Sequence, residues 1–268
     1  MTISIFIVNF NTSDFIELSL YALSKLTVNS YKVKIIDNGS KPSDYQKLQQ
    51  ICSRYNNIEI IKNNTTLRGS IAHGTALNEL CQQIDTPYFS ILDADALWLK
   101  KDWDKILINQ LNENIKVIGT QAPLGSIKPE DFPLMFAIIF ETKTFNKLNI
   151  DFRPQNIALG QDTGFDIREK YQKAKIGGKI IEMKHTENYK SGPLNKVICA
   201  EYYLDKNYLQ IFASHFGRGS STLPVKYMSK NRNSLYNIPV VSTLLAKYKM
   251  LNEKNKWINL CYQIINQQ

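Results

Sequence analysis

The 268-residue sequence lacks the features that would place it in a membrane, in a disulfide-stabilised class or around a structural zinc ion. No run of about twenty apolar residues occurs, so we expect no membrane-spanning helix. The N-terminus, MTISIFIVNFN, has no basic segment and no small-residue cleavage site, which favours a first strand over a signal peptide. The four cysteines (Cys52, Cys81, Cys199, Cys261) show no CxxC spacing. A reducing cytoplasm is therefore the expected location.

Acidic residues are scarce at the C-terminal end, and the net charge of +9 is unevenly spread. From Val225 onward, seven Lys or Arg residues face one acid, Glu253, which gives this segment a charge of +6. Such a tail favours an anionic partner: a membrane surface, a nucleic acid or a phosphorylated substrate. The alternative is a general bias of the composition toward Lys and Asn.

The first hundred residues alternate between apolar strand-like runs and helical patterns. This alternation predicts βαβ units and a parallel sheet. The expected strands are 3–10, 31–40, 58–64 and 88–92, and the expected helices are 13–26, 43–56 and 70–84. Farther on, the sequence predicts strands 116–122, 134–141 and 178–185 and helices 142–148 and 161–175. Residues 186–224 are expected to be rich in loops, and residues 238–267 to form two amphipathic helices separated near Asn252–Asn255. The apolar stripe of this C-terminal segment is expected to consist of Val241, Leu244, Leu245, Tyr248 and Leu251, then Trp257, Leu260, Cys261 and Ile264.

Polar residues follow each of the first four predicted strands. Ligands of open α/β sheets bind beyond the carboxyl ends of the strands. Four polar clusters at one edge therefore predict a polar ligand site, formed by Asn9, Asn11 and Thr12, by Asp37 and Asn38, by residues 63–68, and by Asp93 and Asp95.

The stretch YFSILDADALW places two carboxylates two positions apart where a buried strand ends. Asp93 and Asp95 would repel each other unless a cation lies between them. Mg²⁺ and Mn²⁺ prefer carboxylate oxygens, so a divalent ion fits this pair. The competing interpretation is an ordinary Asp turn or helix cap.

Four segments in this order resemble the family 2 nucleotide-sugar glycosyltransferases of the GT-A fold. They are IFIVNFNTSDFIELSLYAL, KIIDNGS, DADALW and GQDTGFDIREKY, and the resemblance covers about residues 1–185. It implies an α/β fold with a mixed, mostly parallel sheet flanked by helices. We expect residues 1–224 to form the catalytic domain, with a nucleotide-sugar-binding half at 1–100 and an acceptor half at 101–224. Residues 225–268 would be a basic helical extension.

The resemblance also assigns roles to individual residues. Asp95 is expected to bind Mn²⁺ or Mg²⁺ directly, and His215, in SHFGRGS, to complete the metal shell. Asp162 is the candidate general base of an inverting transfer. Donor-side contacts would be Asp93 near the ribose or donor sugar, Asp37 at the nucleoside, Asn11 and Thr12 at the base, and Arg68 at the diphosphate or the base edge.

Other residues are weaker candidates. Arg218 is a candidate for a phosphate contact. Trp98 and Trp103 are expected to be packing residues, with Trp98 kept as an outside candidate for an aromatic contact near a sugar. His73 stands at an unusual place for this family, but we expect structural roles for His73 and His185. Asp166 is expected to face solvent or to pair with Lys170.

The sequence therefore predicts a metal-dependent, inverting glycosyltransferase that uses a nucleotide-sugar donor. The first expectation for the acceptor is a surface glycan or a lipid-linked saccharide, and the minority expectation is modified DNA. Peripheral attachment to an anionic membrane and a homodimer through the C-terminal helices are further expectations. Two rivals remain: a nucleotidyltransferase, and a nucleic-acid- or surface-binding protein with a decayed transferase site. The loop NFNTSD lacks the Gly-rich basic character that a nucleotidyltransferase needs.

Overall fold

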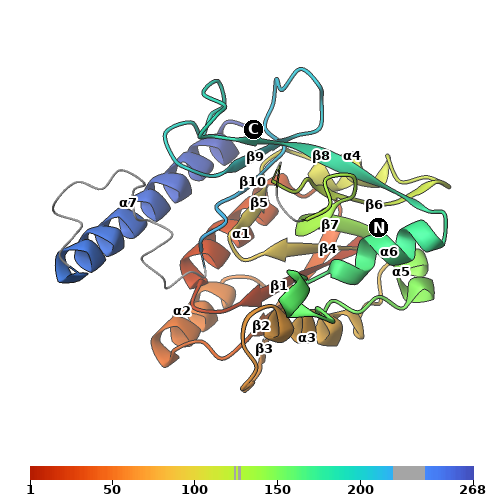
Figure 1. Ribbon diagram of the computed structural model, residues 1–268, viewed down its shortest axis with the longest axis horizontal. Coiled ribbons are helices and arrows are strands. Elements are labelled where there is room, and N and C mark those ends of the chain that lie inside the picture. The colour runs from red at the N-terminus through yellow and green to blue at the C-terminus, as the bar shows by residue number, and fades with distance from the viewer. Residues whose placement is uncertain (124, 126–127, 220–238) are drawn as a thin grey trace.

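The computed structural model describes residues 1–123, 125, 128–219 and 239–268, with side chains in the last segment described from residue 247 on (Figure 1). Ten strands form one sheet in the order β3-β2-β1-β4-β7-β6-β8-β9-β10-β5. The strands are β1 (Thr2–Asn9), β2 (Ser30–Asp37), β3 (Ile58–Lys62), β4 (Tyr88–Asp93), β5 (Ala96–Trp98), β6 (Ile115–Thr120), β7 (Leu134–Glu141), β8 (Gly177–His185), β9 (Ala200–Tyr203) and β10 (Ala213–His215).

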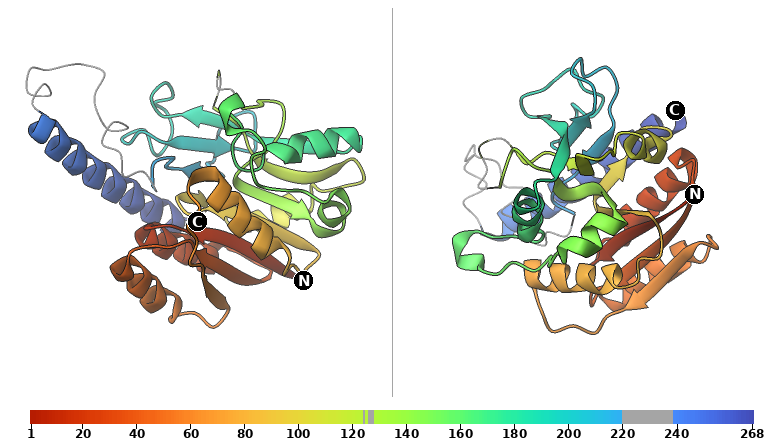
Figure 2. Two further views of the ribbon diagram at one scale, coloured as in Figure 1. Left: turned by 60° about the horizontal axis from the view of Figure 1, so that its bottom comes forward. Right: turned by 90° about the vertical axis from the view of Figure 1, so that its right-hand side faces the viewer.

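Helices cover both faces of this sheet (Figure 2). They are α1 (Ser13–Leu26), α2 (Pro42–Cys52), α3 (Gly69–Cys81), α4 (Trp103–Ile108), α5 (Thr142–Leu148), α6 (Phe165–Lys173) and α7 (Pro239–Asn266), with a short 3₁₀ helix, η1 (Ile157–Leu159). Strand β1 shows how the layers arise, because successive side chains point to opposite faces. Ile3, Ile5 and Ile7 pack with α1, α2, α4 and α7, whereas Phe6 and Val8 pack with α3, α5 and α6. The sequence-based expectation of an α/β fold with flanking helices is confirmed.

The N-terminal half of the sheet is parallel and the C-terminal half contains the antiparallel pairs. Strand β1 pairs in parallel with both β2 and β4, and β2 pairs in parallel with β3. Beyond β4, strand β7 runs antiparallel to β4, and β9 and β10 run antiparallel to their neighbours. The parallel strands bring their carboxyl ends to one edge, which is where the site lies.

Four short elements were not predicted. Strands β5, β9 and β10 have only three or four residues, and α4 has six. The region 186–224, expected to be rich in loops, therefore contains two strands that extend the sheet. Trp98, an outside candidate for a sugar contact, lies on β5 at 1% exposure and stacks on Trp103 with ring centroids 4.8 Å apart. It is a core residue, so the sugar-contact interpretation was wrong.

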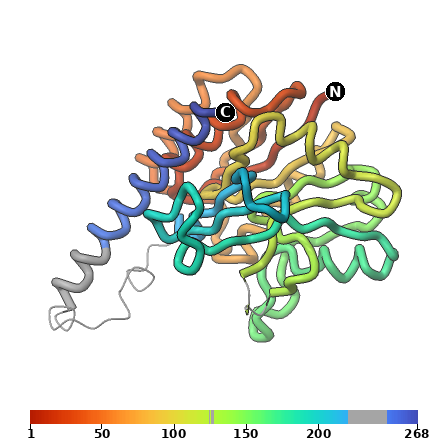
Figure 3. Tube along the Cα trace, turned by 90° about the horizontal axis from the view of Figure 1, so that it is seen from above, coloured from red at the N-terminus to blue at the C-terminus, as the bar shows by residue number. Residues whose placement is uncertain are grey.

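Helix α7 is continuous from Pro239 to Asn266, and the predicted break near residues 252–255 was wrong. The second half of the helix packs on its own domain, beside α1 (Figure 3). Trp257 is fully buried against Phe15 and Phe216, and its indole N–H donates to Ser214 Oγ at 3.1 Å. The ion pair Lys254–Asp14 spans the same contact. The contacts of Trp257 and Lys254 keep residues 252–255 helical, although their Asn- and Lys-rich composition favoured a loop.

Residues Tyr248 and Leu251, expected on the apolar stripe of the C-terminal segment, are instead exposed at 71% and 51%. Three others expected on that stripe, Val241, Leu244 and Leu245, have side chains outside the described part. All four cysteines are free thiols. None of the helices in the described part of the chain combines the length and the apolar character needed to cross a membrane.

Candidate active site

The four predicted polar clusters begin at one edge of the sheet, and the cluster after β3 joins the others through Asn63, whose side chain donates to Asn38 Oδ1 at 2.9 Å. The parallel register pairs Asn9 with Asp37 and Val8 with Asp93, so β1, β2 and β4 end at the same level. The sequence-based expectation that Asp37 and the DAD pair share one edge is therefore met.

A compact cluster of Asp93, Asp95 and His215 stands at this edge. Strand β10 pairs with β5 so that His215 lies opposite Ala96, which brings the imidazole next to the preceding residue, Asp95. His215 Nε2 lies 3.2 Å from Asp95 Oδ1 and 3.8 Å from Asp93 Oδ2. One ligand atom from each residue lies within 4.8 Å of the others. The imidazole is held from behind by Phe136, with ring centroids 4.3 Å apart.

The backbone after β10 fixes the orientation of Asp95. Its Oδ2 accepts hydrogen bonds from the backbone N–H groups of Arg218 (3.0 Å) and Gly219 (2.7 Å), while Oδ1 faces His215. A Cβ on Gly219 would lie 2.6 Å from Asp95 Cβ, so only glycine permits this approach without a shift. Arg218 itself pairs with Glu253 on α7 at 2.6 Å.

The three side chains do not satisfy all of one another's hydrogen-bonding groups. Burial raises the pKa of Asp93, and its Oδ1 is buried without a hydrogen-bond partner among the described residues. Burial opposes the charge on Asp95, but His215 and the Gly219 N–H lower the pKa of this carboxyl. Burial also opposes the charge on His215, whose pKa is nevertheless raised by Asp95. A partnerless buried carboxylate oxygen beside a second carboxylate and an imidazole fits a bound divalent cation, because Mn²⁺ and Mg²⁺ take such donors.

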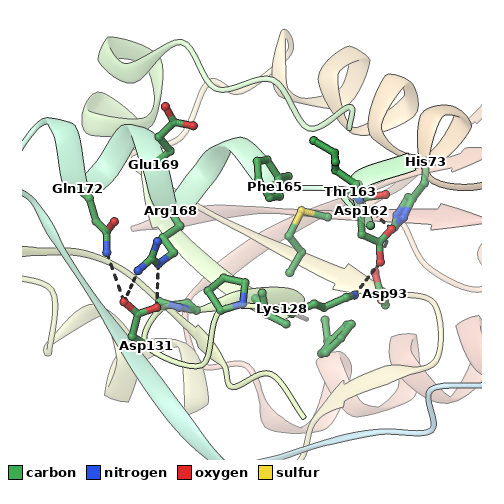
Figure 4. A pocket seen from close by; sticks show the side chains of 18 residues that line it. His73, Asp93, Lys128, Asp131, Asp162, Thr163, Phe165, Arg168, Glu169 and Gln172 are labelled. Carbon is green, nitrogen blue, oxygen red and sulfur yellow. Dashed lines mark hydrogen bonds and ion pairs between the residues drawn. The ribbon is translucent and has the colours of Figure 1, made fainter. Parts of the chain in front are cut away.

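Asp162 lies close to this cluster, on the wall of a cavity that Asp93 and His73 also line (Figure 4). Lys128 Nζ donates to Asp162 Oδ2 at 2.7 Å, the Ser70 hydroxyl donates to Oδ1, and the Thr163 N–H donates to Oδ1 at 2.8 Å. Burial opposes ionisation, but the bonds from Lys128 and Ser70 lower the pKa of Asp162 to about 2.

The predicted helix 161–175 begins too early, at Gln161 instead of Phe165. Gly164 precedes the helix with φ +78°, a left-handed backbone that glycine adopts without strain. Asp162 therefore stands on a loop ahead of α6. Farther along, Asp166 is buried and pairs with Lys170 at 2.6 Å, so the predicted pairing is confirmed.

Three of the predicted donor-side residues, Asn11, Thr12 and Asp37, belong to one hydrogen-bonded network, whereas Asp93 lies in the cluster with Asp95 and His215. Asp37 is buried, and its two oxygens accept from Asn9 Nδ2 (2.7 Å) and from the Ser40 N–H (3.2 Å). The Asn11 N–H donates to Ser40 Oγ at 2.8 Å, and the Thr12 hydroxyl donates to Asn9 Oδ1 at 2.7 Å. Arg68 stands apart from this network, exposed at the start of α3.

Two residues of the site were not assigned to it from the sequence. His73 Nε2 lies 3.8 Å from Asp93 Oδ1, and Lys128 reaches Asp162 from the loop before β7. Ser70, which also contacts Asp162, stands three residues before His73. Residues three apart share one face of a helix, so this spacing could have indicated that both side chains face the site. Nothing local marked Lys128, because its position depends on how the loop folds over the sheet.

Comparison with known proteins agrees with this geometry. The model for glycosyl transferase family 2 matches residues 4–174. The chain belongs to glycosyl transferase family 2. No curated protein sequence matches it.

Solved structures share the fold of this family 2 chain at low identity. A mannosyltransferase from Pyrobaculum calidifontis, in complex with GDP-Man and Mn²⁺, superposes with a TM-score of 0.52 and 13% identity, covering 67% of this chain and 54% of that one. S. aureus TarS, residues 1–349, gives 0.50 and 16%, covering 68% and 58%. Glucosyl-3-phosphoglycerate synthase from Mycobacterium tuberculosis gives 0.50 and 11%, covering 68% of each chain. The first two proteins are considerably longer than the region they share with this chain. The GT-A fold is thus established, whereas donor and acceptor are not.

Proposed function

We propose that this chain is a metal-dependent, inverting glycosyltransferase that moves a sugar from a nucleotide-diphosphate sugar to an acceptor hydroxyl. The observation that carries the proposal is the Asp93–Asp95–His215 cluster, whose Asp93 lines one cavity with Asp162. An ordinary Asp turn would leave its oxygens in water or on backbone N–H groups, whereas Asp93 Oδ1 is buried and accepts no hydrogen bond among the described residues.

Asp95 and His215 are the residues that would hold Mn²⁺ or Mg²⁺, with Asp93 beside them toward the donor sugar. The ion would neutralise the charge that develops on the leaving diphosphate. The protein contributes a rigid seat, because Asp95 is fixed by two backbone N–H groups and His215 by Phe136. Asn11, Thr12, Asp37 and Arg68 are the proposed nucleotide contacts.

Asp162 is the proposed general base. In an inverting transfer one carboxylate takes the proton of the acceptor hydroxyl while its oxygen attacks the anomeric carbon from the face opposite the leaving group. The Ser70 hydroxyl and the Thr163 N–H both donate to Oδ1 of Asp162. Of the hydrogen bonds described above, only the one from Lys128 reaches Oδ2. The acceptor hydroxyl would therefore compete with Lys128 for Oδ2.

The positive charge of the C-terminal segment supports a proposal for where the acceptor is bound and which partners the chain has. The basic segment 225–268 would bind an anionic membrane surface from the cytoplasmic side. The acceptor at that surface would be a glycan or a lipid-linked saccharide. Lys247 and Lys249 flank the exposed Tyr248 on α7, and Lys256 lies farther along the same helix. A homodimer through this helix is the other proposed use of its exposed face.

The test is a screen of nucleotide sugars for hydrolysis, with Mn²⁺, with Mg²⁺ and with chelator. We expect one donor to be hydrolysed in Mn²⁺ and none in chelator. The matched control is Asp95→Asn, which should be inactive under every condition. Full turnover in chelator would refute the metal-dependent mechanism. Absence of turnover, together with no binding of any nucleoside diphosphate, would favour a decayed site.

A further inference from the structure

The cavity beside the candidate base extends well beyond the reacting groups. Its volume is about 660 Å³, within the range of ~300–1,000 Å³ typical of small-molecule sites. One end holds His73, Asp93, Lys128 and Asp162, and the other holds Asp131 and Arg168, with Phe165 between them (Figure 4). A ligand that fills the cavity would thus present one of its groups to Asp162.

An aromatic ring lines the middle of this cavity. Phe165 is the first residue of α6 and is 45% exposed, although phenylalanine is usually buried. Leu159, on η1, also lines the cavity and is 75% exposed. The electron-rich face of an aromatic ring attracts the weakly positive C–H groups on one face of a pyranose. Phe165 therefore offers a stacking platform for a sugar ring.

The charges of the lining oppose an anionic ligand. Both cations are already paired with carboxylates: Arg168 makes a two-pronged contact with Asp131, at 2.8 and 2.5 Å, and Lys128 bonds to Asp162. Asp93 adds a third carboxylate, and a fourth, Glu169, pairs with Lys173 on the same helix. Among the described residues of the lining, a phosphate or carboxylate would therefore have to compete with Asp131 for Arg168 and with Asp162 for Lys128.

We propose that this cavity is the acceptor site and that it takes a neutral saccharide, whose ring packs on Phe165 while one hydroxyl reaches Asp162. Acceptors that carry phosphate or carboxylate on the bound sugar are disfavoured, because the lining's Arg168 and Lys128 are already paired with carboxylates. Asp131 sets this preference, because it neutralises the guanidinium of Arg168, which could otherwise bind an anion. The inference rests on the proposed glycosyl transfer and specifies its acceptor class.

The experiment measures saccharide binding to the full chain by saturation-transfer-difference NMR, without donor. The probes are lactose, maltose, cellobiose and N,N′-diacetylchitobiose, each beside a counterpart with a uronic acid or a 6-phosphate. We expect at least one neutral disaccharide to bind through its ring C–H protons and its charged counterpart to bind more weakly. Phe165→Ala should lower the affinity by about threefold to tenfold, the range of one aromatic contact. Phe165→Tyr should retain it.

Two further variants separate the stacking from the charge. Tyr248→Ala removes an aromatic side chain that is even more exposed, at 71% against 45%, but does not line the cavity, and should leave saccharide binding unchanged. Asp131→Asn frees the guanidinium of Arg168 and should allow the charged counterparts to bind. The inference is overturned if no neutral saccharide binds, if charged counterparts bind the unaltered chain more tightly, or if Phe165→Ala binds as well as the unaltered chain. Donor hydrolysis without any saccharide binding would refute this inference alone, and saccharide binding without hydrolysis of any donor would refute the proposed transfer alone.

Discussion

The two carboxylate oxygens of Asp95 have different partners, and a single substitution separates the roles of the two oxygens. In Asp95→Asn the remaining carbonyl can still accept the N–H groups of Arg218 and Gly219, while the charge that faces His215 is lost. We expect the melting temperature to change little. The Mn²⁺ affinity measured by calorimetry should fall by more than about tenfold, since even residues behind the ligands contribute about 10–100-fold. Asp85→Asn, an exposed carboxylate paired with Lys32, is the control. Unchanged Mn²⁺ affinity in Asp95→Asn would remove this residue from the metal site.

Lys128 controls how basic Asp162 is. The pKa of Asp162 is lowered from its ordinary 3.8 to about 2, so the carboxylate stays ionised throughout the neutral range. A lowered carboxyl pKa stabilises the fold above the ordinary value, and this contribution is lost as the pH falls toward 2. Lys128→Met removes the cation, so the pKa of Asp162 should rise. The acid limb of kcat/KM should therefore lie at higher pH in the variant than in the unaltered chain. Superimposable pH profiles would show that Asp162 is not the base.

At the scale of elements, the loop that follows β10 shapes the proposed metal site as much as the DAD turn does. Gly219→Ala would place a Cβ 2.6 Å from Asp95 Cβ, so the loop must move and its N–H groups must leave Oδ2. Mn²⁺ binding should weaken although every candidate ligand is intact. Gly125→Ala is the control, because a Cβ there meets nothing within 4 Å and only backbone strain is added. Equal Mn²⁺ affinities in the two variants would contradict this role of the loop.

The same elements show what the sequence could predict. Strands β1 to β4 and the helices between them follow local apolar periodicity, and the polar residues at their ends followed from that pattern. Strands β5, β9 and β10 are too short to show a period, and they form only because distant segments pair. The DAD pair, Asp162 and His215 were found through motifs. His73 and Lys128 were not, because their roles depend on tertiary contacts.

At the scale of the whole molecule, the second half of α7 belongs to the core of the catalytic fold. Trp257→Ala should lower the free energy of unfolding by about 3–5 kcal/mol, the usual cost of truncating a buried aromatic residue. It should also weaken Mn²⁺ binding, because the indole bonds to Ser214, the neighbour of His215. Urea denaturation measures the first effect and calorimetry the second. Tyr248→Ala, exposed on the same helix, should change stability by no more than about 0.5 kcal/mol. A small loss of stability in Trp257→Ala would instead support a separable extension.

The bond between Gly219 and Asp95 joins positions 124 residues apart, and this separation has a consequence for the newly made protein. A chain leaving the ribosome from its N-terminus has β1 to β4 available early, since all four strands lie between Thr2 and Asp93. The partners of Asp95 in β10 and in the loop after it are synthesised later. Trp257, which packs over β10, is synthesised later still. A nascent or prematurely ended chain therefore contains the DAD turn without the histidine and the backbone that shape it. On the proposed function, a divalent cation could therefore bind only late in synthesis, and incomplete chains would lack the complete group of ligands that could hold it.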